Sequence, residues 1–185
     1  MRIIGGSARG RKLAGPSSEG TRPLSDRARE ALFNILGPGI RGERVLDLFA
    51  GTGAVGLEAI SRGALSATFV ERDRKALGDI QRNLDMLGFG DQGKAVSGDA
   101  LGFLGRTREA FDVIFAGPPQ WDGLWKTTIA ALDARPEVLA DGGVLITQLD
   151  PSEDDGDPDL EVLARVEART YGKTLLLFHE ARQPD

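Results

Sequence analysis

The fold is decided by the stretch Asp47-Leu48-Phe49-Ala50-Gly51-Thr52-Gly53-Ala54-Val55-Gly56. It overlaps a short apolar run that predicts a buried strand over residues 44–49, and a helix is expected directly after it, over 54–62. Gly51, Gly53 and Gly56 have the G-x-G-x-x-G spacing that lets a nucleotide approach the backbone closely. Glu71 closes a second predicted strand, at a distance along the chain where an acid can hold a ribose hydroxyl. Together these features predict a nucleotide-binding βαβ unit.

Asp47 indicates which nucleotide derivative this unit binds. A carboxylate inside the turn would repel a pyrophosphate, which dinucleotide-binding enzymes place at the helix N-terminus, and it would attract a cation. S-adenosylmethionine has no phosphate and carries a sulfonium and an amino group. The turn therefore favours S-adenosylmethionine, with NAD as the alternative. A turn without any ligand is disfavoured, because interior glycines cost about 1 kcal/mol each.

Composition limits the class of protein. A chain of 185 residues with no internal repeat predicts one domain, residues 1–185. There is no cysteine and only one histidine, His179, so we expect no disulfide, no metal site and no Ser-His-Asp triad. No apolar run is as long as a membrane span, and the N-terminus lacks a signal-peptide core. We expect a cytoplasmic protein with no membrane partner.

The charge is unevenly distributed. Residues 1–30 contain seven basic and three acidic residues, a net +4, so the remaining 155 residues carry −9 of the total of −5. A basic arm or hairpin, residues 1–24, on an acidic body predicts a contact with nucleic acid, and the alternative is a solvated N-terminus. Phosphate contacts are expected from Arg2, Arg9, Arg11, Lys12, Arg22, Arg27 and Arg29.

Strand and helix patterns alternate from residue 44 onward. Besides the elements above, they predict a helix over 26–36, strands over 94–97, 111–116, 144–149, 160–168 and 174–178, and helices over 74–87, 100–106 and about 121–133. The last two strands have no helix between them and predict an antiparallel pair. The acidic segment 150–159 is expected to be a disordered turn. The predicted fold is α/β, a mostly parallel seven-stranded sheet with a C-terminal antiparallel hairpin and helices on both faces.

Motifs along nearly the whole chain resemble one known family. They are Arg2-Ile3-Ile4-Gly5-Gly6, Arg9-Gly10-Arg11-Lys12-Leu13, Arg29-Glu30-Ala31-Leu32-Phe33-Asn34, Asp47 to Gly53, Gly56-Leu57-Glu58-Ala59 and Tyr171-Gly172-Lys173-Thr174. The chain resembles the bacterial 16S ribosomal RNA guanine-N2 methyltransferases, which have the class I methyltransferase (Rossmann-like) fold. The resemblance implies methyl transfer from S-adenosylmethionine to the exocyclic N2 of a guanine in ribosomal RNA, within a small-subunit particle.

The resemblance also implies the donor site. Asp47 and the backbone after it would hold the methionine part, Glu71 the ribose hydroxyls and Asp99 the adenine amino group. Asp99 equally fits the N-cap of the helix that follows, and it could serve both roles. The full implied set is Asp47, Phe49, Ala50, Gly51, Thr52, Gly53, Glu71, Arg72, Asp99, Ala100 and Gly117.

The chain departs from the family where the acceptor base would bind. The family has Asp or Asn, then Pro-Pro, then Tyr or Phe, but this chain has Gly117-Pro118-Pro119-Gln120. The acid and a backbone carbonyl would accept the two amine protons, and the ring would stack on the base. Gly117 supplies no carboxylate and Gln120 supplies no ring.

Three explanations stay open for this departure. Asp122 and Trp121 could replace the acid and the ring, the acceptor could be a different group, or the chain could be an inactive homologue acting as an RNA-binding or assembly factor. We expect an active enzyme that holds the acceptor with Pro118, Pro119, Gln120, Trp121 and Asp122. For Trp121, core packing fits its helical spacing equally well.

Overall fold

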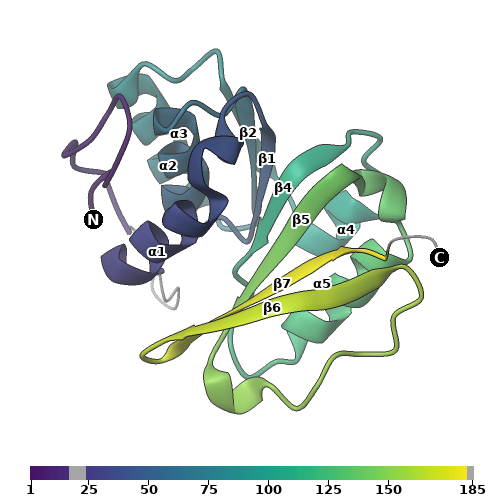
Figure 1. The fold of residues 1–185 in the computed structure, drawn as a ribbon. Coiled ribbons are helices and arrows are strands. Elements are labelled where there is room, and N and C mark those ends of the chain that lie inside the picture. Colours follow the sequence, from purple (N-terminus) through teal and green to yellow (C-terminus); the bar gives the residue numbers. More distant parts are fainter. Residues whose placement is uncertain (17–23, 183–185) are drawn as a thin grey trace.

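A computed structural model of the chain describes residues 1–16 and 24–182 (Figure 1). In this part of the chain, one seven-stranded sheet has the order β3-β2-β1-β4-β5-β7-β6. Its parallel strands are β1 (Arg44–Leu48), β2 (Ser66–Glu71), β3 (Gly93–Ser97), β4 (Phe111–Ala116) and β5 (Leu139–Leu149). β7 (Thr174–Ala181) lies antiparallel between β5 and β6 (Leu163–Tyr171). The predicted mixed sheet with its antiparallel C-terminal pair is confirmed.

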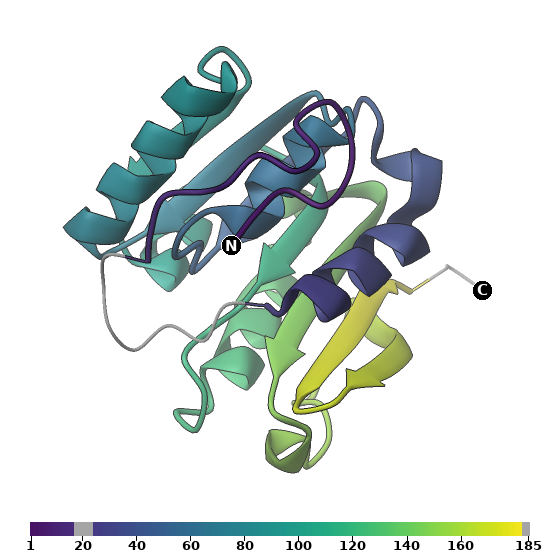
Figure 2. The same ribbon diagram turned by 90° about the vertical axis from the view of Figure 1, so that its left-hand side faces the viewer.

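Helices cover both faces of the sheet (Figures 1 and 2). The first face carries α1 (Asp26–Leu36), α2 (Ala54–Ser61) and α3 (Arg74–Leu87), and the second carries α4 (Ala100–Leu104) and α5 (Leu124–Asp133). Short 3-10 turns are η1 (Gly37–Ile40), η2 (Pro136–Val138) and η3 (Pro151–Glu153). None of the helices in residues 1–16 and 24–182 is long and apolar enough to cross a bilayer.

The central strands read as continuous apolar runs because both of their faces are covered. On β1, Val45 packs with the helices of the first face, whereas Leu46 and Leu48 pack with those of the second. Asp47 is the exception in this run and lies on the first face with its register partners Phe69 and Phe115.

The helix predicted over about 121–133 begins later, at Leu124. Gly123 has a left-handed φ of 65° and forms the N-cap, and Trp121 also has a positive φ, of 72°. Trp121 is 66% exposed. Core packing of Trp121 was therefore a wrong interpretation, and the buried tryptophan of this region is Trp125 on α5.

The N-terminal arm, here residues 1–16, lies across α2 and α3 (Figure 2). An antiparallel bridge joins Arg2 and Lys12, as the predicted hairpin requires. The buried carboxylate of Glu58 on α2 accepts hydrogen bonds from the backbone N–H groups of Ile4 and Gly5, both at 2.8 Å. The described part of the arm is thus bound to the body, rather than being a free solvated N-terminus.

The acidic segment 150–159 is folded, contrary to the expected disordered turn. Arg165 on β6 pairs with Asp154, at 2.8 Å, and with Asp157. Lys126 on α5 lies 2.6 Å from Asp155. The Arg165 guanidinium lowers the pKa of Asp154. The prediction of disorder considered only the acidic residues of the segment. It did not include Lys126 on α5, before the segment, and Arg165 on β6, after it.

Candidate functional site

A pocket of about 570 Å³ opens at the carboxyl ends of the central strands. Ligands of open α/β sheets bind at this edge. Among the described residues it is lined by Leu24, Asp47, Phe49, Ala50, Gly51, Thr52, Ala54, Val55, Val70, Glu71, Arg72, Asp73, Gly98, Asp99, Ala100, Phe115, Gly117, Pro118, Pro119, Gln120, Trp121, Leu124 and Gln148. The pocket therefore brings together the residues of the predicted donor site, except Gly53, and those of the acceptor motif, except Asp122.

The glycines of the turn have different structural reasons. Gly51 and Gly53 have φ values of 55° and 74°, which only glycine adopts without strain. A Cβ on Gly56 would lie 2.3 Å from the Phe69 ring, so this glycine lets α2 approach β2 closely. The third glycine of the motif thus serves helix–sheet packing, whereas Gly51 lines the pocket and Gly53 forms the N-cap of α2.

Glu71 is held by the backbone around it. Its two carboxylate oxygens accept the N–H of Gly51 at 2.8 Å and the N–H of Asp73 at 2.9 Å. A carboxylate has about four acceptor positions. Two positions therefore stay available to hydroxyl groups in the pocket, and the side chain that presents them is fixed in place.

Asp47 is 2% exposed and accepts the backbone N–H of Gly56 at 3.0 Å, in the first turn of α2. Burial raises the pKa of Asp47 to about 8, the Gly56 hydrogen bond opposes this shift, and the nearby Glu71 charge adds to it. The carboxyl group therefore keeps its proton at neutral pH in the free protein. The prediction from the sequence assumed that Asp47 always carries a negative charge. In the structure Asp47 is a buried acid that a neighbouring cation would ionise.

We call the part of the pocket lined by residues 47, 49–52, 71–73, 99 and 100 the donor half, and the part lined by residues 117–121 and 148 the acceptor half. The other acids of the donor half are helix caps. Asp99 accepts the N–H of Gly102 at 2.8 Å and is the N-cap of α4, so the capping role considered for it is present. Asp73 accepts N–H groups of Lys75 and Ala76 and caps α3. Both acids line the pocket, so capping does not remove them from it.

The acceptor half of the pocket includes the exposed Trp121, whereas Asp122 lies outside the described lining. Trp121 lines its mouth, and its backbone N–H donates to Glu153 Oε1 of the acidic segment at 2.6 Å. Asp122 is exposed and is not among the described lining residues. The structure thus keeps Trp121 as a candidate for stacking, and it does not place Asp122 where the missing carboxylate would be.

Sequence reasoning missed Gln148 at the end of β5. The residue is 7% exposed and lines the pocket, and its side chain makes no hydrogen bond to any residue that the structure describes. The only signal in the sequence is one amide within an apolar strand. Leu24 and Phe115 were missed too, because apolar lining residues look like any other core residue.

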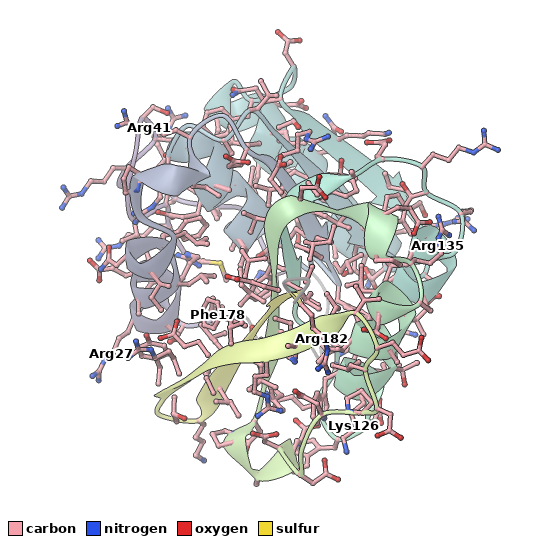
Figure 3. All side chains as sticks on the ribbon, turned by 45° about the vertical axis from the view of Figure 1, so that its right-hand side comes forward. Arg27, Arg41, Lys126, Arg135, Phe178 and Arg182 are labelled. Atoms are coloured by element: carbon pink, nitrogen blue, oxygen red, sulfur yellow. The ribbon has the colours of Figure 1, made fainter. Side chains whose placement is uncertain are left out.

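The predicted phosphate-binding residues do not form one class. Arg2, Arg9, Arg11, Lys12 and Arg27 are exposed, and Arg27 on α1 points outward in Figure 3. Arg29 is fully buried, with Nε 3.8 Å from Glu58 Oε2, and it donates to the carbonyl of Arg2. Burial lowers the pKa of Arg29. Arg29 thus fastens the arm to α1 and α2 and cannot reach a phosphate, which corrects that prediction, and Arg22 lies outside the described residues.

Known proteins match the chain over most of its length. The family model described as Conserved hypothetical protein 95 matches residues 1–180. Ribosomal RNA small subunit methyltransferase D of Escherichia coli K12 is 45% identical over 72% of this chain and 67% of its own, and the protein of that name from Haemophilus influenzae is 41% identical over 71% and 70%. The solved structure of yhhF from Escherichia coli shares 35% identity, covers 100% of this chain and 99% of its own, and has a TM-score of 0.85.

These matches identify the family. The chain belongs to the family of ribosomal RNA small subunit methyltransferase D, as the resemblance predicted, and has the class I methyltransferase fold. It is therefore an S-adenosylmethionine-dependent methyltransferase, and the NAD alternative is not supported by these relatives.

Proposed function

We propose that this chain transfers a methyl group from S-adenosylmethionine to the exocyclic N2 of a guanine in small-subunit ribosomal RNA. The observation that carries the proposal is one pocket that joins the Asp47 turn and the Glu71 carboxylate to Pro118 and Pro119. Relatives named ribosomal RNA small subunit methyltransferase D support ribosomal RNA as the substrate.

The residues of the donor half fit S-adenosylmethionine. The volume of about 570 Å³ suits a nucleoside-sized ligand. Glu71 offers two acceptor positions for ribose hydroxyls, and Asp47 can become ionised beside a cation. Asp99 lines the same pocket, and we assign it to the adenine amino group. When bound, the donor supplies a methyl group activated by a sulfonium and leaves as a neutral thioether.

The residues of the acceptor half would position the base. An exocyclic amine needs acceptors for its two protons, and Pro118 and Pro119 present carbonyls but no N–H groups. Trp121 offers an exposed ring on which an extruded base can stack. Positioning and exclusion of water contribute much of a transfer rate without any acid.

We assign the exposed basic residues of the arm and of α1 to phosphate contacts: Arg2, Arg9, Arg11, Lys12 and Arg27. Such contacts orient RNA without reading its sequence. Since the whole chain carries a net charge of −5, tight binding to naked RNA is not expected. A folded small-subunit particle in the cytoplasm, which offers shape as well as charge, is the proposed substrate.

Tritium transfer tests the proposal. Small-subunit particles from a strain that lacks the corresponding gene are incubated with the protein and methyl-labelled donor, and the RNA is digested to nucleosides. We expect label in N2-methylguanosine. Label in another nucleoside would mean that the enzyme methylates a different base. If calorimetry shows donor binding but no RNA is labelled, the proposal is contradicted.

A second candidate function is an RNA-binding or assembly factor without transfer activity. It is favoured by two observations, the glycine at position 117 and the location of Asp122 outside the described pocket lining. This candidate predicts binding to the particles with no incorporation of label, so the same experiment distinguishes the two.

A further inference from the structure

We propose that the Gln148 side chain is the hydrogen-bond acceptor for the amine of the substrate base, in place of the residue that Gly117 lacks. This inference deepens the proposed function and depends on it. It concerns a residue on β5, a different strand from the one that carries the Pro-Pro motif.

The first observation is that the Gln148 amide has no hydrogen-bond partner among the described residues and is reachable from the pocket. Only 7% of the residue is exposed, and its amide atoms are not among the fully enclosed, unpaired polar atoms of the described residues. Buried polar groups are nearly always paired, and each exception needs a specific explanation. Gln148 lines the pocket, so a ligand that enters the pocket can supply the missing partner.

The second observation is the distance between Gln148 and Gly117. A Cβ built on Gly117 would lie 3.6 Å from Gln148 Oε1. The sheet register explains this approach, because Ala116 of β4 pairs with Thr147 of β5, so the next residue on each strand is a neighbour. The amide oxygen of Gln148 thus borders the space that a side chain at position 117 would enter.

The third observation is which side chains lie nearest to position 117. Gln120 also lines the pocket and carries an amide, but the three atoms nearest to a Cβ at position 117 belong to Phe115 and Gln148. Asp122, the acid considered from the sequence, is not among the described lining residues. Phe115, which also lines this region, is apolar, and a Cβ on Gly117 would lie 3.3 Å from its ring. Gln148 is therefore the side chain next to position 117 whose oxygen can accept a hydrogen bond from an amine.

A carboxamide suits this role chemically. Its oxygen accepts an amine N–H, and its NH2 group donates to a carbonyl or ring nitrogen of the same base. Guanine presents an amine next to a ring nitrogen. Gln148 takes up no proton itself, so the proton that the amine loses passes to water, and the side chain orients the amine.

The experiment compares three variants with the wild type. Gln148→Met keeps the size and removes the acceptor, Gln148→Ala combined with Gly117→Asn moves an amide to the other strand, and Gln81→Ala on the exposed side of α3 is the control. The measurements are S-adenosylhomocysteine affinity by calorimetry, melting temperature, and single-turnover transfer to unmethylated small-subunit particles.

We expect Gln148→Met to slow transfer about 10-fold, the effect of one hydrogen bond, with donor affinity unchanged within about 2-fold. Its melting temperature should not fall, because the amide makes no hydrogen bond to a described residue of the free protein. The double variant should regain most of the rate, since Gln148→Ala makes room for the new side chain. Gln81→Ala should change none of the three measurements.

Two results would overturn the inference. A lower melting temperature for Gln148→Met would mean that the amide stabilises the free protein, and an unchanged transfer rate would mean that it does not contact the base. If the wild type itself transfers no label while it binds the donor, the proposed function fails, and this result is distinct from both.

Discussion

The two halves of the pocket differ in how their polar groups are used. In the donor half, Asp47, Glu71, Asp73 and Asp99 each accept at least one backbone N–H. In the acceptor half, Gln148 has no partner among the described residues, and Trp121 is exposed with a φ of 72°. The donor half is preorganised by its own backbone, whereas the acceptor half keeps groups available for a partner that arrives later.

The strongest test of the donor half is Glu71→Gln. The variant loses the charge that both backbone N–H groups and the ribose hydroxyls share, so donor affinity should fall about 100-fold, about 3 kcal/mol. Calorimetry with S-adenosylhomocysteine measures it. Glu109→Gln, which changes an exposed acid paired with Lys94, is the matched control and should bind like the wild type. Equal affinities for the two variants would mean that Glu71 does not contribute to donor binding.

Asp47→Asn tests whether ionisation of the buried Asp47 carboxyl group destabilises the folded protein. Because the folded pKa of Asp47 is raised to about 8, its contribution to stability is complete below the ordinary pKa near 4 and is lost as the pH rises through 8. Asparagine does not titrate and still accepts the Gly56 N–H. The variant should therefore gain free energy of unfolding over the wild type by about 1.4 kcal/mol for each pH unit between 4 and 8, and almost nothing at pH 4.

Urea denaturation at the two pH values measures this difference. A gain of equal size at both pH values would show that Asp47 does not keep its proton in the folded protein. The same variant should bind the donor more weakly, since asparagine cannot become an anion beside a cation. Stability would then increase while donor affinity decreases. For Glu71, which accepts two backbone N–H groups, we expect no such gain in stability.

Trp121 tests the acceptor half. Stacking of a base on an aromatic ring contributes about 1–3 kcal/mol, so Trp121→Ala should lower kcat/KM for small-subunit particles about 10-fold or more. Donor affinity should be unchanged. Trp121→Phe keeps a ring and should retain most of the activity. If alanine and phenylalanine act alike, Trp121 does not stack on the substrate.

The smallest effect is expected for the arm. Replacing Arg9 and Lys12 together by alanine should weaken particle binding a few-fold and make it less dependent on salt, with a slope smaller by about 1 to 2. Arg74→Ala with Lys75→Ala, an exposed basic pair on α3, is the control. An equal loss in both double variants would mean that overall charge, and not the arm, attracts RNA.

The sequence predicted the helices and strands around the Asp47 turn well because they depend on local patterns. The bounds of α3 and β4 were predicted to the residue, and the strand before the glycine turn was one residue too long. Glycine spacing and an acid at a strand end are visible without knowing any long-range contact. The family resemblance then predicted S-adenosylmethionine as the methyl donor.

The acceptor half was harder because its features depend on contacts between distant parts of the chain. Trp121 and Trp125 share a helical spacing, and the positive φ of Gly123 that separates them is not visible in the pattern. Gln148 becomes significant only when β5 lies beside β4. Arg29 has the same limitation, because its partner Glu58 is 29 positions away.

Glu58 also has a consequence for how the protein folds. During synthesis the arm leaves the ribosome well before α2, whose Glu58 binds Ile4 and Gly5. Ile4 and Gly5 therefore have no binding site on α2 until the segment after the glycine turn has emerged. The arm can therefore take up its place over α2 only after the glycine turn and the first part of α2 have been synthesised.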